Sequence, residues 1–501
     1  MSKIRLLAML LVCPVASVAV GDELQNKIWS HVIVMDHLGD PKRPEIQSVG
    51  KTVTIRLADF RPKSNGVMPY WGNYDDYVEN IRKEIVRSGK AVLFFVHGGM
   101  NVNSQAASRA ATILRDNSIK EYYPIFICWD SPFYGDWEQA LWVRAGKTER
   151  YGRGLAYSIL TTPFQLLSDV GRAATRLPLV LCTSAYSDLY SIRPSGFTEH
   201  QVMESEYAAY HGSSDPPIPS PQRIATQKGS DRRSTTQKIE RNISLVATIP
   251  LKVATHPVID AIGVGAWNNM LRRTDTMFER VPHYHTKDAP LPSQMLNGKP
   301  TGALAIFMDT LQGPSGIGKK TKVTLVGHSM GAIICNRIVA QYQGLNYDRI
   351  VYMAAACRVS DFEQAVIPYL QKHPDTCFYN LSLHPVCEAG EMFQLGNFPF
   401  DVVPRGSLLV WIDNIFGNPP SEQRRMLGIY QTAVLASHNV PLAQRKQVFY
   451  KAFDAVPQNQ MTRPNSDLVI EPQRHGDFSR SPFWEPKFWS VDARSAASMP
   501  N

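Results

Sequence analysis

Cysteine is scarce in this sequence, and its spacing matches no common metal site. Seven cysteines are spread over 501 residues, and no two of them form a C-x-x-C pair. The pattern therefore indicates neither a zinc site nor a small scaffold held by disulfides. Cys377 and Cys387 flank one expected strand, and the sequence leaves open whether they pair.

Motifs for nucleic-acid binding are also lacking, although the chain is basic. Its formal net charge is +9, but no zinc-finger spacing, basic helix or aromatic RNA-binding motif accompanies this charge. We therefore expect no nucleic-acid partner. The charge favours solubility and attraction to anionic substrates or membrane surfaces, so peripheral membrane contact stays open. The sequence does not fix the oligomeric state.

Neither the N-terminal apolar stretch nor the central part of the chain offers an uncharged run of membrane-spanning length. The N-terminal stretch, Leu6–Val20, follows Lys3 and Arg5 and ends among small residues. This arrangement is typical of a signal peptide with a cleavage site. We interpret residues 1–21 as a signal peptide that is removed on export, which would place the mature chain in the periplasm or outside the cell.

One glycine-rich stretch nearly matches a nucleotide-binding loop but lacks a decisive residue. Residues 313–319 fit G-x-x-x-x-G-K, yet Lys320 stands where the loop needs Ser or Thr to bind the metal. The apolar run 323–326 comes after the glycines, so the stretch leads into a strand and opens no helix. We interpret it as a turn.

From residue 90 the chain alternates between apolar strand-like runs and helical periodicity. Nearly continuous apolar strands separated by helices are typical of a parallel sheet buried on both faces. The sequence therefore predicts an α/β fold, with a mostly parallel central sheet flanked by helices. Two upstream runs, 31–37 and 51–60, open the sheet, the second as a half-exposed edge. The later strands lie within residues 90–99, 124–130, 322–329, 349–356, 376–385 and 446–453.

A long insertion interrupts this alternation between residues 132 and 300. Much of it has helical periodicity, and we expect a large helical cap over the site. Residues 212–238 are rich in Pro, Ser, Gln and basic side chains, a composition that predicts a disordered loop within the cap. On this division, residues 22–131 and 301–501 form the two parts of the α/β core.

The motif G-x-S-x-G, residues 327–331, stands between a β-branched run and a helical segment. In that context it predicts a nucleophile elbow, a tight strand-to-helix turn that exposes the hydroxyl of Ser329. The backbone N–H of Met330 then lies at a helix N-terminus, where developing negative charge is stabilised. We therefore expect Ser329 to be a nucleophile and Met330 N–H to be a donor in the oxyanion hole.

Three segments in this order, "FFVHGG", "LVGHSMGA" and "RHGDF", resemble the α/β-hydrolase superfamily, in particular its lipase- and esterase-like members. The resemblance covers roughly residues 90–131 and 301–480. It implies the chain order serine, acid, histidine. The loop after the last expected strand then holds the base, which favours His475 over His373, His384 and His438.

The resemblance also suggests the remaining parts of the site. The acid should follow a strand, and Glu388 is the first choice, with Asp361 as its rival. The second donor in the oxyanion hole should be the N–H of Gly99, in the turn after the "FFVHGG" strand. His97 would anchor that turn without taking part in the chemistry.

Together these residues indicate a serine hydrolase that cleaves carboxylic esters, with a lipid-like or other acyl ester as the substrate class. No metal or cofactor is implied. A thioesterase, an amidase or an acyltransferase would use the same residues, because fold and triad do not fix the substrate. A non-catalytic binding protein of the same fold is a further alternative, which reaction of Ser329 with a fluorophosphonate would distinguish.

Overall fold

The computed structural model describes residues 22–60, 72–144, 155–192, 225–227, 229–280, 300–395, 398–399, 401–417, 421–457, 471–479 and 486–489. The expected signal peptide and residues 212–224 of the expected disordered loop lie outside this part of the chain. The described residues fall into two compact units. The first contains those up to Pro132, with Arg272–Thr324 and Tyr342–Tyr347, and the second contains the rest.

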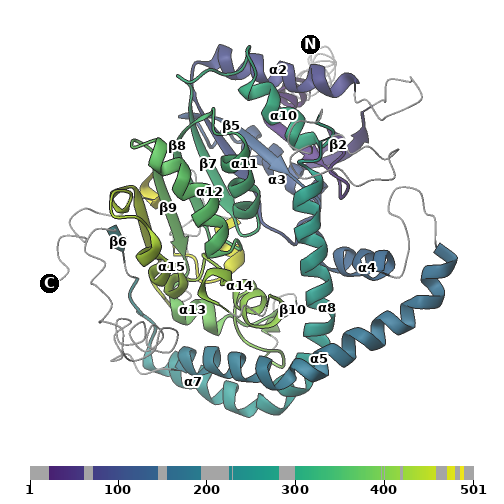
Figure 1. Ribbon diagram of the computed structural model, residues 1–501, viewed down its shortest axis with the longest axis vertical. Helices are drawn as coiled ribbons and strands as arrows, with labels where there is room; N and C mark the ends of the chain where they lie inside the picture. The colour runs from purple at the N-terminus through teal and green to yellow at the C-terminus, as the bar shows by residue number, and fades with distance from the viewer. Residues whose placement is uncertain are drawn as a thin grey trace, which may run out of the picture. The chain divides into compact units, whose positions relative to one another are not determined.

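The described residues form a mixed, mostly parallel β-sheet with flanking helices (Figure 1). This confirms the α/β architecture that alternating apolar strands and helices predict. In the first unit the strand order is β3 (Val53–Asp59), β2 (Pro41–Val49), β1 (Val32–Met35), β5 (Tyr122–Cys128) and β4 (Ala91–Val96). Strand β2 is antiparallel to both neighbours, whereas β1, β5 and β4 are parallel.

Strand β2 was not predicted from the sequence, where Pro41 and Pro44 argue against a strand because proline cannot donate to the ladder. The structure places β2 between β1 and β3. The carbonyl of Pro44 still accepts a hydrogen bond, from the indole Nε1 of Trp29 at 2.8 Å. Strand β3 lies at the edge of the sheet, as its alternating pattern predicts.

Helix α3 (Asn103–Arg115) packs against β3, where hydroxyl groups close the edge of the strand. The hydroxyls of Ser108 and Thr112 accept the backbone N–H groups of Ile55 and Val53, each at 3.0 Å. The helix approaches closely because its buried face carries small side chains, namely Ala106, Ala107, Ala110 and Ala111.

Helices α2 (Gly72–Ser88) and α10 (Ala303–Gln312) pack against each other in the first unit. The hydroxyl of Tyr74 donates to the carbonyl of Ala303 at 3.0 Å. Phe307 of α10 meets Phe94 of β4 edge to face, with ring centroids 6.0 Å apart. These contacts hold β4, and therefore the turn that follows it, in the core of the first unit.

The sheet order continues with β7 (Lys322–His328), β8 (Asn346–Met353), β9 (Cys377–Ser382), β12 (Val448–Ala452) and β6 (Ala225–Gln227), and the second unit contains these strands except the first residues of β7 and β8. Strands β8, β9, β12 and β6 are parallel. Cys377 and Cys387 are both free, so they do not pair. The helices of the C-terminal part include α11 (Gly331–Gln341), α12 (Val359–Lys372), α13 (Pro385–Gly390), α14 (Leu408–Trp411), α15 (Tyr430–Ala436) and α16 (Pro486–Trp489).

The described part of residues 132–300 is mostly helical. It contains α4 (Phe133–Arg144), α5 (Leu155–Ile192), α7 (Thr235–Ala247) and α8 (Ile249–Thr276). Residues Phe133–Leu271 belong to the second unit, where α5 packs against α13. No single described helix is long and apolar enough to cross a membrane, although α7 and α8 together, bent by 69°, meet that criterion of length and composition.

The disorder predicted for residues 212–238 is wrong for the described part of that segment. Strand β6 pairs in parallel with β12, adding an edge strand to the sheet. Helix α7 then begins with a capping box, in which Ser234 Oγ accepts the N–H of Gln237 and the Gln237 side chain accepts the N–H of Ser234. The composition argument missed this local helix-start signal.

Candidate active site

Ser329 occupies a sharp turn between strand β7 and helix α11, the context predicted from the G-x-S-x-G motif. Its φ angle of 53° lies in the left-handed region, which residues other than glycine rarely adopt. Neighbouring backbone holds this conformation: Ser329 N donates to Met353 O at 2.9 Å, and Ser329 O accepts the N–H groups of Ala332 and Ala356. Such strain, fixed by surrounding structure, is typical of functional positions.

Gly327 is required at this turn because helix α11 passes close to it. A Cβ atom at Gly327 would lie 2.8 Å from both the backbone N of Ala332 and Sγ of Cys335. Any side chain at this position would therefore push the start of α11 away from β7. The first glycine of the motif sets the distance between strand and helix that the left-handed serine needs.

His475 meets Ser329 across 146 residues of sequence. Its Nε2 atom lies 2.9 Å from Ser329 Oγ, within hydrogen-bonding distance. Both side chains are buried. The structure thus brings together the predicted nucleophile and the predicted base.

A short 3₁₀ turn, η6 (His475–Ser479), presents the imidazole. The carboxylate of Asp477 shapes the approach to this turn, because its Oδ2 accepts the N–H groups of Gln473 and Arg474, each at 3.1 Å. Phe478 is fully buried and packs edge to face on Phe453, with ring centroids 5.7 Å apart. Asp477 is therefore a structural residue of the turn and not the partner of the imidazole.

Two side chains hold the backbone of His475. Its N–H donates to Oε2 of Glu391 at 2.9 Å. Its carbonyl lies 3.3 Å from Nε2 of His328, the residue before Ser329. Because a carbonyl only accepts, the hydrogen of the His328 ring is on Nε2 in this contact. His475 is thereby tied both to the turn at Ser329 and to the segment after α13.

The environment of His475 favours the neutral imidazole. Burial, and secondly the nearby ring of His328, lower its pKa to about 3. Its Nδ1 is buried without a hydrogen-bond partner among the described residues. A neutral ring can accept the proton of Ser329, whereas the resulting imidazolium would need a negative charge near Nδ1 for its stabilisation.

Neither acid predicted from the sequence reaches that position. Glu388 is buried in α13, where the hydroxyl of Ser407 donates to its carboxylate. Burial raises the pKa of Glu388 to about 8, and the charge of Glu391 adds to this, against the Ser407 hydrogen bond. Asp361 lies in the first turn of α12, where its carboxylate accepts the N–H of Arg358 at 3.0 Å and so caps the helix.

Glu391, which was not chosen from the sequence, is the carboxylate that contacts His475. It directly follows α13, three residues after Glu388, and its backbone carbonyl accepts the N–H of Gly406 at 2.8 Å. The short helix α13 separates Glu391 from the end of β9. Because the sequence argument favoured the carboxylate nearest the strand end, it did not choose Glu391. The sequence does mark α13, because Pro385 stands at a first helical position and His384 can cap the helix.

The two predicted oxyanion-hole donors lie in different units. Met330 is buried and directly precedes α11, whose first N–H groups have no partner within the helix. Gly99 lies in the turn after β4 in the first unit, where its carbonyl and that of Gly98 accept the side-chain amide of Asn101, each at 2.9 Å.

His97 anchors the turn after β4, as predicted. Its Nε2 accepts the backbone N–H of Trp129 at 3.0 Å, so the ring hydrogen is on Nδ1, which donates to the carbonyl of Gly98 at 2.7 Å. The indole Nε1 of Trp129 donates to the carbonyl of His97 at 3.1 Å. The two rings stack with centroids 5.9 Å apart. These contacts account for His97 without any catalytic role.

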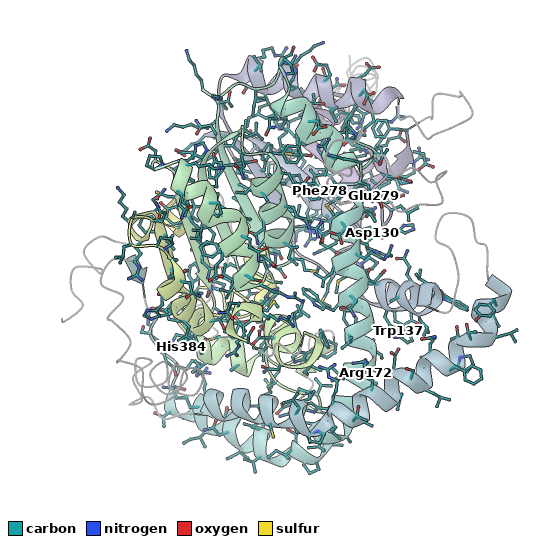
Figure 2. The ribbon with its side chains drawn as sticks, viewed as in Figure 1. Asp130, Trp137, Arg172, Phe278, Glu279 and His384 are labelled. Carbon is teal, nitrogen blue, oxygen red and sulfur yellow. The ribbon has the colours of Figure 1, made fainter. Side chains whose placement is uncertain are left out.

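The other late histidines have structural positions. His384 caps α13 by accepting the N–H of Val386 on Nδ1, and it is labelled in Figure 2. His373 ends α12 and stacks on Tyr369, with ring centroids 4.0 Å apart. His438 lies in a 3₁₀ turn after α15, where its carbonyl accepts a hydrogen bond from Arg445.

Two further expectations concern bound groups. No cluster of three or more His, Cys, Asp or Glu side chains within the described ranges could hold a metal ion. The glycine-rich stretch 313–319 forms turns that lead into β7, so no helix begins there, as predicted for an ordinary connection.

No protein-family model matches this chain, and neither a curated protein nor a solved structure matches it.

Proposed function

We propose that this protein is a serine hydrolase that cleaves carboxylic esters through Ser329 and His475. One observation carries the proposal: Nε2 of His475 lies 2.9 Å from Oγ of a serine held in a left-handed conformation between a strand and a helix. In this reaction Ser329 attacks the acyl carbon while His475 takes its proton. His475 then protonates the departing alcohol, and water releases the acyl group from Ser329 by the same route.

The sequence resemblance to lipase- and esterase-like α/β-hydrolases agrees with this chemistry. The mostly parallel sheet with flanking helices is compatible with that fold. In the proposed reaction the N–H of Met330, at the N-terminus of α11, stabilises the negative oxygen of the tetrahedral intermediate. The N–H of Gly99 stays the predicted second donor on the strength of the resemblance. The helices of residues 133–276 stay the proposed cap.

Glu391 is the proposed orienting acid in place of Glu388 and Asp361. Its carboxylate already accepts the backbone N–H of His475, so a rotation of its side chain could bring an oxygen to Nδ1 of the same residue. Glu388 is less suitable because a pKa of about 8 keeps it largely protonated at neutral pH. Asp361 is committed to the first turn of α12.

Fluorophosphonate labelling tests the proposal, because the reagent reacts with an activated serine and needs no knowledge of the substrate. The parent chain should be labelled and should hydrolyse nitrophenyl esters, and a panel of acyl lengths would then define the substrate. Ser329→Ala should lose labelling and lower ester turnover by up to about 10⁶-fold. Ser479→Ala, an exposed serine of the η6 turn, is the matched control and should behave like the parent. A Ser329→Ala protein that keeps the parental rate would refute the mechanism.

A further inference from the structure

Exposed apolar side chains are concentrated on three helices, α5, α7 and α8. Of the 21 large apolar residues that are exposed in the described part of the chain, 15 lie on α5, α7 and α8. Scattered surface apolar residues are normal in a water-soluble protein, but a concentration of this kind marks an interaction surface. We call these three helices the apolar layer; Figure 1 shows α5 and α7 together near one edge of the drawing, and the two are in contact.

The first half of α5 is amphipathic in the reverse sense to a helix of a water-soluble protein. Its less exposed side carries polar residues at a spacing of four, Thr161, Gln165 and Asp169, and Asp169 is buried. A helix packed on a protein in water normally turns its apolar stripe inward. The outward side of α5 instead carries Tyr157, Ile159, Leu160, Phe164, Leu167 and Val170, each at least 55% exposed.

Helix α7 also exposes apolar side chains. Ile239, Ile243 and Val246 follow one another at helical spacing on α7 and are all more than half exposed. On the inner side, Ser244 donates to the carboxylate of Asp401 in the segment after α13. These three apolar residues of α7 thus point to solvent, whereas Leu245 is buried and the hydroxyl of Ser244 points to a carboxylate inside.

A network of charged side chains lies on the inner side of the apolar layer. Lys252 of α8 is almost fully buried and forms an ion pair with Asp401 at 2.9 Å, and Arg405 binds the same carboxylate. Burial alone would raise the pKa of Asp401, but hydrogen bonds from Arg405, Ser244 and Lys252 lower it far below its usual range. The carboxylate therefore stays charged inside the protein.

A second ionic contact links α5 with α8. Asp260 of α8 is almost fully buried and lies 2.7 Å from Arg172 of α5, which is labelled in Figure 2. Arg176, one turn later on α5, lies 3.3 Å from the same carboxylate and donates to the carbonyl of Ile415 at 2.7 Å. Charge inside and apolar side chains outside is the arrangement of helices whose surroundings are hydrocarbon.

We propose that the apolar layer docks on a phospholipid membrane, with the outward side chains of α5 and α7 inserted into the acyl region of one leaflet. A lipid leaflet fits better than a protein partner because the exposed positions of α5 between Tyr157 and Val170 carry no charge. Protein interfaces need regular hydrogen bonds and a polar rim, whereas acyl chains need neither. The net charge of +9 adds attraction to an anionic leaflet. The proposal does not depend on the proposed hydrolase activity.

Vesicle flotation with the full chain tests this docking. We would compare the parent with the triple variant Leu160→Ser, Phe164→Ser and Leu167→Ser, on vesicles of phosphatidylcholine with and without phosphatidylglycerol. These positions are about 70% exposed, so the fold should persist, as circular dichroism melting would show. The parent should float with the vesicles, and the α5 variant should bind on the order of a hundredfold more weakly or worse.

A matched control separates the apolar layer from general surface hydrophobicity. Val49→Ser, Val86→Ser and Leu442→Ser change three apolar side chains that are also exposed, by 48%, 52% and 67%, but lie outside the layer, and this variant should float like the parent. The N-terminal apolar stretch is common to all variants, so it cannot produce the difference. Equal flotation of the α5 variant and the parent would overturn the proposal. So would a parent that ignores vesicles and forms a dimer that the α5 variant cannot form, because the layer would then seat a second copy.

Discussion

The two ring nitrogens of His475 have different surroundings: Nε2 is 2.9 Å from Ser329 Oγ, while Nδ1 is buried without a hydrogen-bond partner among the described residues. In the proposed reaction His475 can accept the proton of Ser329, but no described side chain would stabilise the resulting imidazolium at Nδ1. The carboxylate of Glu391 contacts the backbone N–H of His475 and not its ring. The predictions below follow from this one-sided arrangement.

Removal of the imidazole should silence the serine. We expect His475→Ala to abolish fluorophosphonate labelling of Ser329 at neutral pH, because the hydroxyl loses its proton acceptor. His438→Ala is the matched control, since His438 also follows Ser329 in the chain but lies in the turn after α15. The test compares the labelling rates of the two variants with that of the parent. If only His438→Ala lost labelling, His475 would be excluded as the base.

Exchange of the two glutamates for glutamine should identify the acid. Glu391→Gln keeps an oxygen for the N–H of His475 but removes the charge, so we expect turnover to fall by about 10² or more. Glu388→Gln should have little effect at pH 7, because Glu388 with a pKa of about 8 is already mostly neutral there. Ester kinetics of both variants provide the test. Full activity of Glu391→Gln together with an inactive Glu388→Gln would return the role to Glu388.

Glu388 should also make the stability of the fold depend on pH. Its pKa is raised from 4.5 to about 8 by burial, so the folded chain holds this proton more tightly than the unfolded chain does. Its contribution to the free energy of unfolding is therefore largest below pH 4.5 and falls as the pH rises towards 8, by on the order of 4 kcal/mol. Urea unfolding at pH 5 and pH 8.5 should show a larger loss for the parent than for Glu388→Gln. Glu240→Gln, at an exposed position of α7, is the control, and its free energy of unfolding should fall between the two pH values as much as that of the parent.

The low pKa of His475 should extend activity to acid pH. An imidazole with its ordinary pKa of 6.5 would slow labelling about 25-fold between pH 7 and pH 5, since most of it becomes protonated. With a pKa of about 3, His475 should stay neutral, and the labelling rate at pH 5 should remain close to that at pH 7. An acid limb near pH 6.5 would show that a carboxylate already holds Nδ1 in the free protein.

The elbow should not tolerate a methyl group at its first glycine. Gly327→Ala would place Cβ 2.8 Å from the backbone N of Ala332, and we expect a loss of about 1–3 kcal/mol in the free energy of unfolding, with slower labelling of Ser329. Gly171→Ala is the control, because a Cβ there meets nothing within 4 Å and α5 should gain slightly from alanine. Melting temperatures and labelling rates measure both effects. A Gly327→Ala protein as stable and reactive as the parent would contradict the tight elbow.

The features that could be predicted from the sequence are those that local chemistry determines. The turn at Ser329 follows from glycines between a β-branched run and a helical run, and His475 follows from its loop position after the last strand. The contact of Glu391 with His475 could not be predicted, because Glu388 and Glu391 are of the same residue type and only the structure shows which of them contacts His475. The composition of residues 212–238 hid both the edge strand β6 and the capping box at Ser234, because each depends on a few positions within a polar stretch.

The hydroxyls that α3 extends to β3 have a consequence for self-association. An unprotected outer strand is a template on which another chain can add a strand and start a fibre. The backbone N–H groups of Val53 and Ile55, which could otherwise donate to the carbonyl groups of an added strand, already donate to the hydroxyls of Thr112 and Ser108. Although this chain exposes many apolar side chains on its helices, its edge strand β3 is thus protected against the addition of a strand from another chain.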